Sequence, residues 1–131
     1  MIKVLVIEDD RLTRDIILNL LLVREISAIA AADGRAGLQL AKEVIPDLIL
    51  CDVRMPVLSG YDVLAALRQD STTATIPLIF LTAETNQDAI KRGQQLGANG
   101  YLNKPFTTAE LLSAIAPYLS KAEDAGGEEK N

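Results

Sequence analysis

The stretch Leu48-Ile49-Leu50-Cys51-Asp52-Val53-Arg54-Met55-Pro56 indicates how the chain folds. Its first four residues form a short apolar run, which is typical of a strand buried in a parallel sheet rather than of a helix. The run ends at the carboxylate of Asp52. In open α/β sheets, ligands and chemistry collect outside the carboxyl ends of the strands. The stretch therefore predicts a buried strand that carries an acidic side chain into a functional site.

Five units of a strand followed by a helix are predicted along the chain. The expected strands are residues 3–7, 27–32, 48–51, 76–81 and 100–102, and the expected helices are residues 11–24, 35–44, 60–69, 86–96 and 108–121. Capping residues such as Asp10, Ser59 and Thr107 precede helices, and Gly97 follows one. Alternation with short links is typical of α/β proteins. We therefore expect a doubly wound, five-stranded parallel sheet with five helices on its two faces.

The end of the chain differs in composition from the rest. Residues 122–131 are rich in Gly and Glu and hold no apolar residue larger than alanine. Such a segment cannot bury enough apolar surface to fold alone. We therefore expect one domain over residues 1–121, followed by a disordered tail or the beginning of a linker.

The first expected helix holds more apolar residues than one buried face needs. Its core stripe is expected to contain Leu12, Ile16, Ile17, Leu20 and Leu21, at helical spacing. Leu18 and Leu22 would then lie one turn apart on the opposite side. Two interpretations stay open, an ordinary apolar surface or a contact with a partner or a second copy of the chain.

Composition excludes several classes of function. The chain of 131 residues has a net charge of −5, which argues against binding to nucleic acid or to an anionic membrane. No apolar run is long enough to span a membrane, and the single cysteine, Cys51, favours a cytoplasmic location. There is no histidine, so chemistry that needs an imidazole must borrow it from a partner.

Polar side chains stand at the ends of four expected strands. They are Glu8 and Asp9, Asp52, Thr82, and Lys104. Parallel strands present their carboxyl ends at one edge of a sheet, so these side chains should share one site. Clustered carboxylates suit a hard cation, with Mg²⁺ as the expected one. A lysine and a hydroxyl beside them could neutralise an arriving phosphoryl group, which makes Asp52 a candidate covalent acceptor.

Four motifs carry a resemblance to a known family. They are Glu8-Asp9, Asp52-x-x-Met55-Pro56-x-x-x-Gly60, Thr82-Ala83 and Tyr101-x-x-Lys104-Pro105-Phe106. In this order and spacing, over about residues 2–119, the sequence resembles the receiver domains of two-component response regulators. The resemblance implies a flavodoxin-like fold with strand order 2-1-3-4-5.

The resemblance also implies a phosphorelay function. Asp52 would accept a phosphoryl group from a histidine kinase or a histidine phosphotransfer protein. Asp9 would bind Mg²⁺ directly, Glu8 would act through water, and the backbone carbonyl of Arg54 would complete the protein ligands. Lys104 would pair with the phosphoryl oxygens, aimed by a cis peptide bond before Pro105.

The expected output of the same resemblance is a conformational switch. Thr82 would move toward the phosphoryl group and Tyr101 would swing inward, altering the face of the fourth helix, fifth strand and fifth helix for a downstream protein. Arg54 and Glu84 occupy the two positions that tune phosphate lifetime in this family, and their opposite charges could shield the acyl phosphate. The chain would be a switch, not a turnover enzyme, and a stand-alone regulator is favoured over a receiver cut from a longer protein with an output domain.

Two other functions are weighed against this one. A phosphohydrolase with an aspartyl nucleophile would use Mg²⁺, lysine and threonine too, but such enzymes carry a second acid two residues after the nucleophile, where this chain has Arg54. A flavin carrier on the same fold would need aromatic residues to sandwich the ring and a phosphate-binding loop. The chain has no Trp and no Ser/Thr/Gly-rich loop after the first strand.

Overall fold

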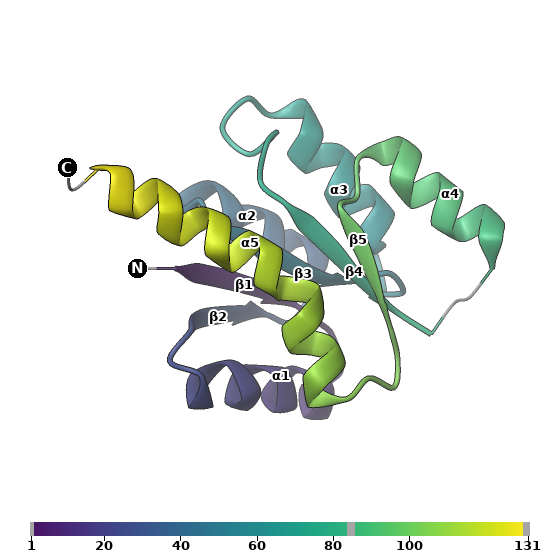
Figure 1. Cartoon of the computed structure of the whole chain (residues 1–131). Helices are drawn as coiled ribbons and strands as arrows, with labels where there is room; N and C mark the ends of the chain where they lie inside the picture. The colour runs from purple at the N-terminus through teal and green to yellow at the C-terminus, as the bar shows by residue number, and fades with distance from the viewer. Residues whose placement is uncertain (1, 84–85, 130–131) are drawn as a thin grey trace.

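The computed structural model describes residues 2–83 and 86–129, with side chains described as far as residue 120. Five strands form one parallel sheet in the order β2-β1-β3-β4-β5, as predicted (Figure 1). The strands are β1 (Lys3–Ile7), β2 (Ser27–Ala31), β3 (Leu48–Asp52), β4 (Leu78–Thr82) and β5 (Gly100–Asn103). The helices are α1 (Arg11–Val23), α2 (Gly34–Val44), α3 (Gly60–Gln69), α4 (Gln87–Leu96) and α5 (Thr108–Glu129).

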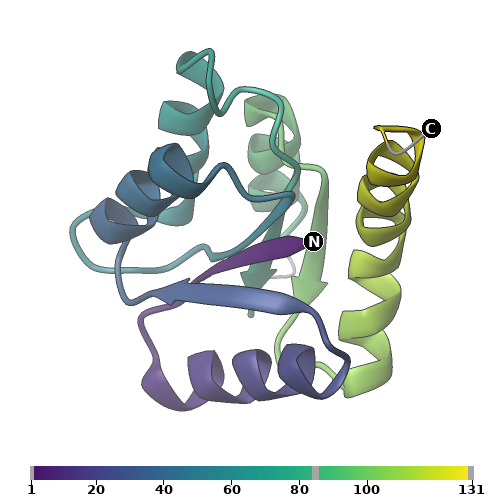
Figure 2. The same ribbon diagram turned by 90° about the vertical axis from the view of Figure 1, so that its left-hand side faces the viewer.

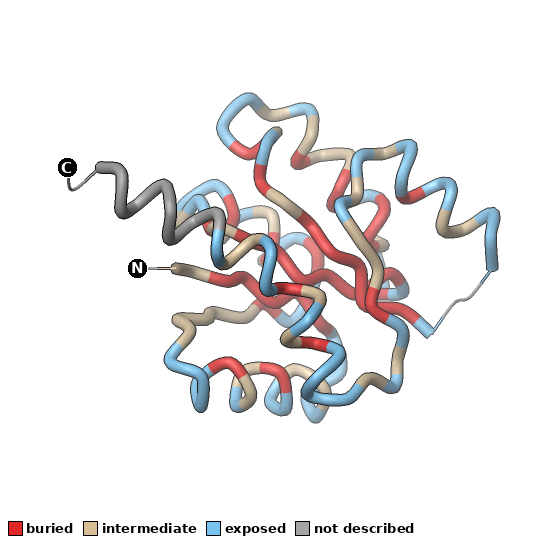
Figure 3. Tube along the Cα trace, in the orientation of Figure 1, coloured by how far each residue is buried: buried red, intermediate tan, exposed pale blue. Residues whose placement is uncertain are grey.

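The sheet is covered by helices on both faces (Figure 2). Alternate strand residues point to opposite faces, so each strand contributes to two apolar layers. Leu5, Ile49 and Phe80 pack with residues of α2, α3 and α4, whereas Val4 and Leu50 pack with residues of α1 and α5. The central strands are buried throughout (Figure 3). This confirms the doubly wound α/β fold and fixes the carboxyl edge of the sheet as the place where loops converge.

Local capping signals in the sequence fix several helix ends. Asp10 accepts a hydrogen bond from the backbone N–H of Thr13 at the start of α1. Ser59 and Asp62 form the predicted capping box at the start of α3. Gly97 ends α4 with φ of 102°, a conformation that glycine adopts without strain. These short-range contacts are the reason the predicted boundaries hold.

Helix α1 faces the sheet differently from the expected arrangement. Ile17 and Leu21 are fully buried, but Leu12 is 69% exposed and Ile16 48% exposed, so their assignment to the core stripe is wrong. Leu18 packs partly against the core, so the expectation that it faces away with Leu22 is also wrong. Leu12 is rotated by roughly 140° from Ile17 around the helix axis, which turns it away from the sheet. Only Leu22, 70% exposed, lies on the surface as expected.

Two element ends differ from the prediction by more than one residue. Strand β4 begins at Leu78 rather than at residue 76, because Pro77 has no N–H to donate to a neighbouring strand. Helix α5 continues to Glu129, so its expected end near residue 121 is wrong. Residues 122–125 are alanines and acids, which a helix accommodates, although the Gly- and Glu-rich composition of residues 122–131 favours a disordered tail. The domain boundary at residue 121 stays a prediction, and residues 130–131 lie outside the described residues.

None of the helices in the described part of the chain combines the length and the apolar character that a membrane crossing requires.

Candidate functional site

Four neighbouring strands deliver polar side chains to the carboxyl edge of the sheet. The residues are Glu8 and Asp9 after β1, Asp52 at the end of β3, Thr82 at the end of β4, and Lys104 after β5. The strand order places β1, β3, β4 and β5 side by side at this edge. Glu8, Asp52 and Thr82 are buried, whereas Asp9 is exposed. The residues predicted from the strand ends therefore share one site.

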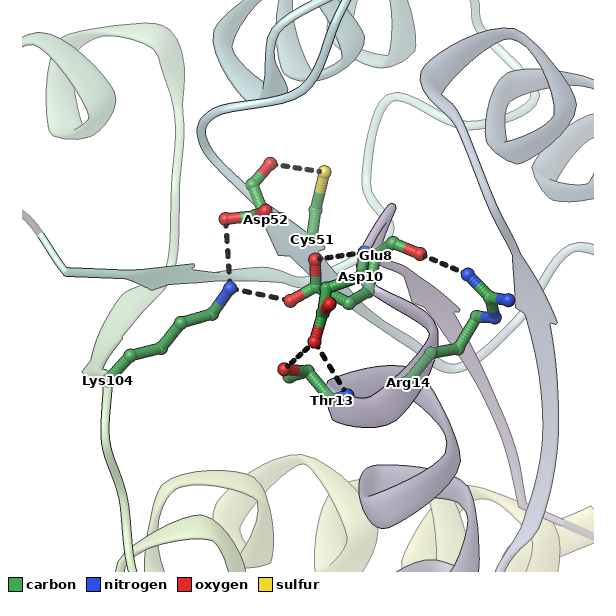
Figure 4. Close-up of polar contacts among 7 residues, drawn as sticks. All are labelled: Glu8, Asp10, Thr13, Arg14, Cys51, Asp52 and Lys104. Carbon is green, nitrogen blue, oxygen red and sulfur yellow. Dashed lines mark hydrogen bonds and ion pairs between the residues drawn. The ribbon is translucent and has the colours of Figure 1, made fainter.

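The ammonium group of Lys104 lies between two carboxylates (Figure 4). Its Nζ is 2.5 Å from Glu8 Oε1 and 3.2 Å from Asp52 Oδ1. Glu8 has no exposed surface, and Asp52 is 7% exposed. Burying a charge is costly unless the charge is paired. Lys104 therefore compensates both acids, although it lies 96 positions from Glu8 in the sequence.

The protonation of Asp52 is displaced from its ordinary range. Its pKa is raised from 3.8 to about 7, first through burial and then through the hydrogen bond and negative charge of Glu8, while Lys104 acts in the opposite direction. Burial alone lowers the pKa of Lys104, but the hydrogen bonds and charges of Glu8 and Asp52 outweigh it and raise that pKa overall. The lysine is thus a permanent cation, and Asp52 is a carboxyl group whose charge depends on what else binds beside it.

Replacing Asp52 by asparagine is expected to stabilise the metal-free protein increasingly as the pH rises. The pKa of Asp52 is about 7 in the folded protein and 3.8 in the unfolded chain. The contribution of the Asp52 proton to stability is therefore complete below pH 3.8, and it is lost as the pH rises through about 7. Asparagine does not titrate. Urea unfolding of both proteins at about pH 5 and about pH 8, without metal, measures the difference.

Excess Mg²⁺ serves as the control for this prediction, because a cation beside the carboxylates should reduce the advantage of asparagine. A stability difference that is the same at both pH values would contradict the assignment of the raised pKa to Asp52.

Three carboxylates at this edge are placed to hold a metal ion. One ligand oxygen from each of Glu8, Asp9 and Asp52 lies within 4.8 Å of the others. A set of only oxygen ligands suits a hard cation, and Mg²⁺ in particular needs few protein ligands because it retains water. The donor set therefore fits the predicted metal, with Asp9 supplying the solvent-facing carboxylate.

The loop between β1 and α1 holds the acidic pair in place. The guanidinium of Arg14 donates to the backbone carbonyl of Glu8 at 2.8 Å (Figure 4). The N–H of Asp10 donates to Glu8 Oε2 at 3.2 Å, while the Asp10 carboxylate caps α1 through Thr13. This role of Arg14 was not predicted, because its only local signal in the sequence is its position one helical turn after Asp10.

The remaining predicted residues are placed as follows. The Lys104–Pro105 peptide bond is cis, the conformation that the resemblance implied. The Tyr101 hydroxyl donates to the carbonyl oxygens of Ala89 and Ile90 in α4. Arg54 is exposed beside the site, but Glu84 lies outside the described residues, so the proposed pairing of the two is untested.

Cys51 adjoins the site in sequence without facing it. It is fully buried in the layer formed with α2 and α3, and its thiol donates to the carbonyl oxygen of Asp52 at 3.3 Å. Burial is the main cause that raises its pKa far above the ordinary value for a thiol. The thiol therefore stays protonated and behaves as a small core residue, as the opposite phase of the strand suggests.

Comparisons with known proteins agree with this arrangement. The family model for the response regulator receiver domain matches residues 4–116. The chain therefore belongs to the response regulator receiver domain family.

Relatives of two kinds are found. The transcriptional regulatory protein CpxR of Escherichia coli K12 is 37% identical over 129 residues, which cover 98% of this chain and 54% of CpxR. The chain spans about half the length of such relatives. The chemotaxis protein CheY4 of Vibrio cholerae is 34% identical, with a TM-score of 0.86 over 90% of this chain and 98% of CheY4.

A third relative carries a metal. The receiver domain of a sensor histidine kinase from Pseudomonas aeruginosa PAO1 was solved with a magnesium ion coordinated in its active site cleft. It is 31% identical, with a TM-score of 0.83 over 90% of this chain and 97% of that domain.

Proposed function

We propose that this chain is a phosphorylation-dependent signalling switch in which Asp52 accepts a phosphoryl group from a phosphohistidine of a partner. The single observation that carries the proposal is the placement of Asp52 between an ammonium group and two further carboxylates at the carboxyl edge of the sheet. A histidine kinase or a histidine phosphotransfer protein supplies the imidazole that this chain lacks.

The chemistry is an in-line transfer. A carboxylate oxygen of Asp52 attacks phosphorus, an O–P bond forms, and the N–P bond of the donor breaks, leaving the electron pair on the imidazole nitrogen. Lys104, already 3.2 Å from Asp52 Oδ1, would pair with a phosphoryl oxygen, and the hydroxyl of Thr82 would bond another. Mg²⁺ held by Glu8, Asp9, Asp52 and the Arg54 carbonyl would supply neutralisation of the phosphoryl charge. The side chains thus lower the barrier by electrostatics and positioning.

Incubation with acetyl phosphate and Mg²⁺, followed by intact-mass measurement, tests the proposal. Wild type should gain the mass of one phosphoryl group, and Asp52→Asn should gain none. Chelation of Mg²⁺ should also suppress the gain in wild type. Circular dichroism of each sample checks that both proteins are folded, and no gain in folded wild type would overturn the mechanism.

A second assay, release of phosphate from a generic phosphate monoester, separates the switch from a phosphohydrolase. Arg54 occupies the position where such enzymes carry a second acid, so water attack on the acyl phosphate lacks a positioned general acid and base. The proposed chain therefore turns over its own phosphate slowly and does not process phosphate monoesters. Sustained release of phosphate from a generic monoester would favour the hydrolase.

The proposed switch is either a stand-alone regulator or the receiver of a longer protein. The similarity to CheY4 over nearly its full length supports a stand-alone regulator that contacts a downstream protein through α4, β5 and α5. The length of CpxR, a transcriptional regulatory protein, supports the alternative of a receiver joined to an output domain outside this chain, in which case the whole protein would regulate transcription. An immunoblot of the source cells distinguishes them, because the second setting requires a band about twice as large. The cytoplasmic location stays a prediction.

A further inference from the structure

Two tyrosines from different elements converge on one carbonyl of α4. The hydroxyl of Tyr61, at the start of α3, donates to the carbonyl oxygen of Ala89 at 3.2 Å. The hydroxyl of Tyr101, in β5, donates to the same oxygen at 3.2 Å and to that of Ile90 at 3.0 Å. Tyr101 has one hydroxyl proton, which is shared between these two oxygens, and the Ala89 carbonyl lies within hydrogen-bonding distance of both tyrosines. The first turns of α4 are therefore fastened by both tyrosines together.

The rings of these tyrosines are joined through Phe80 of β4. The Tyr61 and Phe80 ring centroids are 5.3 Å apart in an edge-on arrangement, and those of Phe80 and Tyr101 are 5.5 Å apart. Phe80 lies two residues before Thr82, on the same side of the strand. Displacement of Tyr101 thus removes a packing neighbour of Phe80, the ring against which Tyr61 also rests.

Gly93 allows α4 to lie close to the row of rings formed by Tyr61, Phe80 and Tyr101. A Cβ atom at this position would overlap the Tyr101 hydroxyl and lie 2.8 Å from Tyr101 Cζ. The guanidinium of Arg92, the preceding residue, stacks over the opposite end of the row, 4.5 Å from the centroid of the Tyr61 ring. The position of Tyr101 against α4 therefore depends on the absence of a side chain at Gly93.

The start of α3 is in turn fixed to the proposed phosphoacceptor. The N–H of Gly60 donates to the carbonyl of Val53 at 2.7 Å. A Cβ at Gly60 would overlap the carbonyl oxygen of Asp52 and lie 2.9 Å from Val53 Cα. Tyr61 follows Gly60 directly. A shift of the backbone around Asp52 would consequently reach Tyr61 through one rigid contact.

We propose that Tyr61 is a positioning residue for Tyr101: through the shared Ala89 carbonyl and Phe80 it links the Asp52 loop to α4, and Gly93 permits the close approach of Tyr101 to α4. The link forms a second route from the site to α4, beside the one through Thr82. The role of Tyr101 as a reporter of phosphorylation rests on the proposed function. The contact between the two tyrosines does not, and it can be tested without phosphorylation.

The chain offers a direct probe of this link, since it holds three tyrosines and no tryptophan. Labelling with 3-fluorotyrosine gives ¹⁹F resonances from Tyr61, Tyr101 and Tyr118, which the three Tyr→Phe variants assign. Gly93→Ala supplies the reference resonance for a displaced Tyr101. In unphosphorylated Tyr61→Phe, which keeps the ring and loses the hydroxyl, the Tyr101 resonance should shift from the wild-type position toward this reference.

Tyr118→Phe is the matched control. It removes a tyrosine hydroxyl that bonds the backbone carbonyl of Asn99 at 3.3 Å, outside the row, and should leave the Tyr101 resonance in place. A Tyr101 resonance at the wild-type position in Tyr61→Phe would overturn the inference. An unchanged Tyr101 resonance in Gly93→Ala would overturn the part assigned to Gly93.

The phosphorylation arm keeps the two proposals separate. With acetyl phosphate and Mg²⁺, the Tyr61 and Tyr101 resonances of wild type should shift together, and the Tyr101 shift should shrink in Tyr61→Phe although that variant gains the same mass. A failed mass gain would count against the proposed function alone. A full mass gain with an undiminished Tyr101 shift in Tyr61→Phe would count against the link alone.

Discussion

Replacement of Lys104 by methionine is expected to slow phosphorylation of Asp52 by acetyl phosphate about a hundredfold or more. Methionine matches the length of the lysine stem but cannot donate to a phosphoryl oxygen, and loss of one preorganised donor to a developing charge costs roughly 10² to 10³ in rate. The rate is measured as the time course of mass gain at saturating Mg²⁺. Lys104→Arg is the control that retains a cation with a different shape, and it should recover part of the rate.

The same variant should respond to pH in a defined direction. Lys104 lowers the pKa of Asp52, so its removal raises that pKa further above 3.8 and leaves fully buried Glu8 without its cation. Because the pKa of Asp52 is higher in the folded protein than in the unfolded chain, the stability that depends on the Asp52 proton is lost as the pH rises. Lys104→Met should therefore be destabilised more at about pH 8 than at about pH 5 in metal-free urea unfolding. Equal phosphorylation rates in wild type and variant would contradict the proposed role of Lys104.

The fold, and the side chains at the carboxyl edge of the sheet, could be predicted from short sequence patterns. Each strand is a short apolar run and several helix ends carry capping residues, so alternation can be recognised without knowledge of contacts. The rule that parallel strands share a carboxyl edge then brings Glu8, Asp52 and Lys104 together. The order and direction of the strands determine which residues meet at this edge. Residues far apart in the sequence could therefore be assigned to one site.

The orientation of α1 could not be predicted in the same way. Eight of its 13 residues are apolar, so periodicity does not select one buried face. The sheet beneath the helix selects Ile17 and Leu21 and leaves Leu12 exposed. Capping residues define where a helix begins, but they carry no information about its rotation around its axis.

Side-chain contacts between loops and helices were also outside the reach of the sequence. Tyr61 reaches a carbonyl 28 positions away, and Arg14 supports Glu8 through a backbone atom rather than through its charge. Every residue has a backbone carbonyl, so the type of residue does not show which carbonyl will accept a hydrogen bond from a distant side chain. Such contacts become visible only when the elements that carry them are placed in space.

Arg68 is the strongest example of a contact that the sequence hides. Its guanidinium donates to the carbonyl oxygens of Ala74 and Ile76 before β4, to that of Gly97 after α4, and to Asn99 Oδ1. Asn99 Oδ1 also accepts from the N–H of Leu78, the first residue of β4. One side chain of α3 therefore holds together the two connections that lead into β4, which ends at Thr82, and β5, which Lys104 follows.

Arg68→Ala is accordingly expected to lower the free energy of unfolding by about 2–4 kcal/mol. Five hydrogen bonds from a charged donor are lost and several carbonyl groups lose a partner, each loss costing about 1–3 kcal/mol when buried and less where water can replace the donor. Urea unfolding followed by circular dichroism measures the change. Arg68→Lys keeps the charge but not the planar fork that spans both connections, so it should recover only a minor part of the stability.

Arg35→Ala is the matched control, because it removes an exposed arginine from the surface of α2 and should change the stability by no more than about 0.5 kcal/mol. The lost energy in Arg68→Ala should also appear locally. Relative to wild type, the hydrogen-exchange rates of the β5 amides should increase more than those of the β1 amides, since Arg68 holds the connection into β5 and not the one into β1. An unfolding midpoint equal to that of Arg35→Ala would show that water satisfies the exposed carbonyl groups and that the Arg68 hydrogen bonds contribute no net stability.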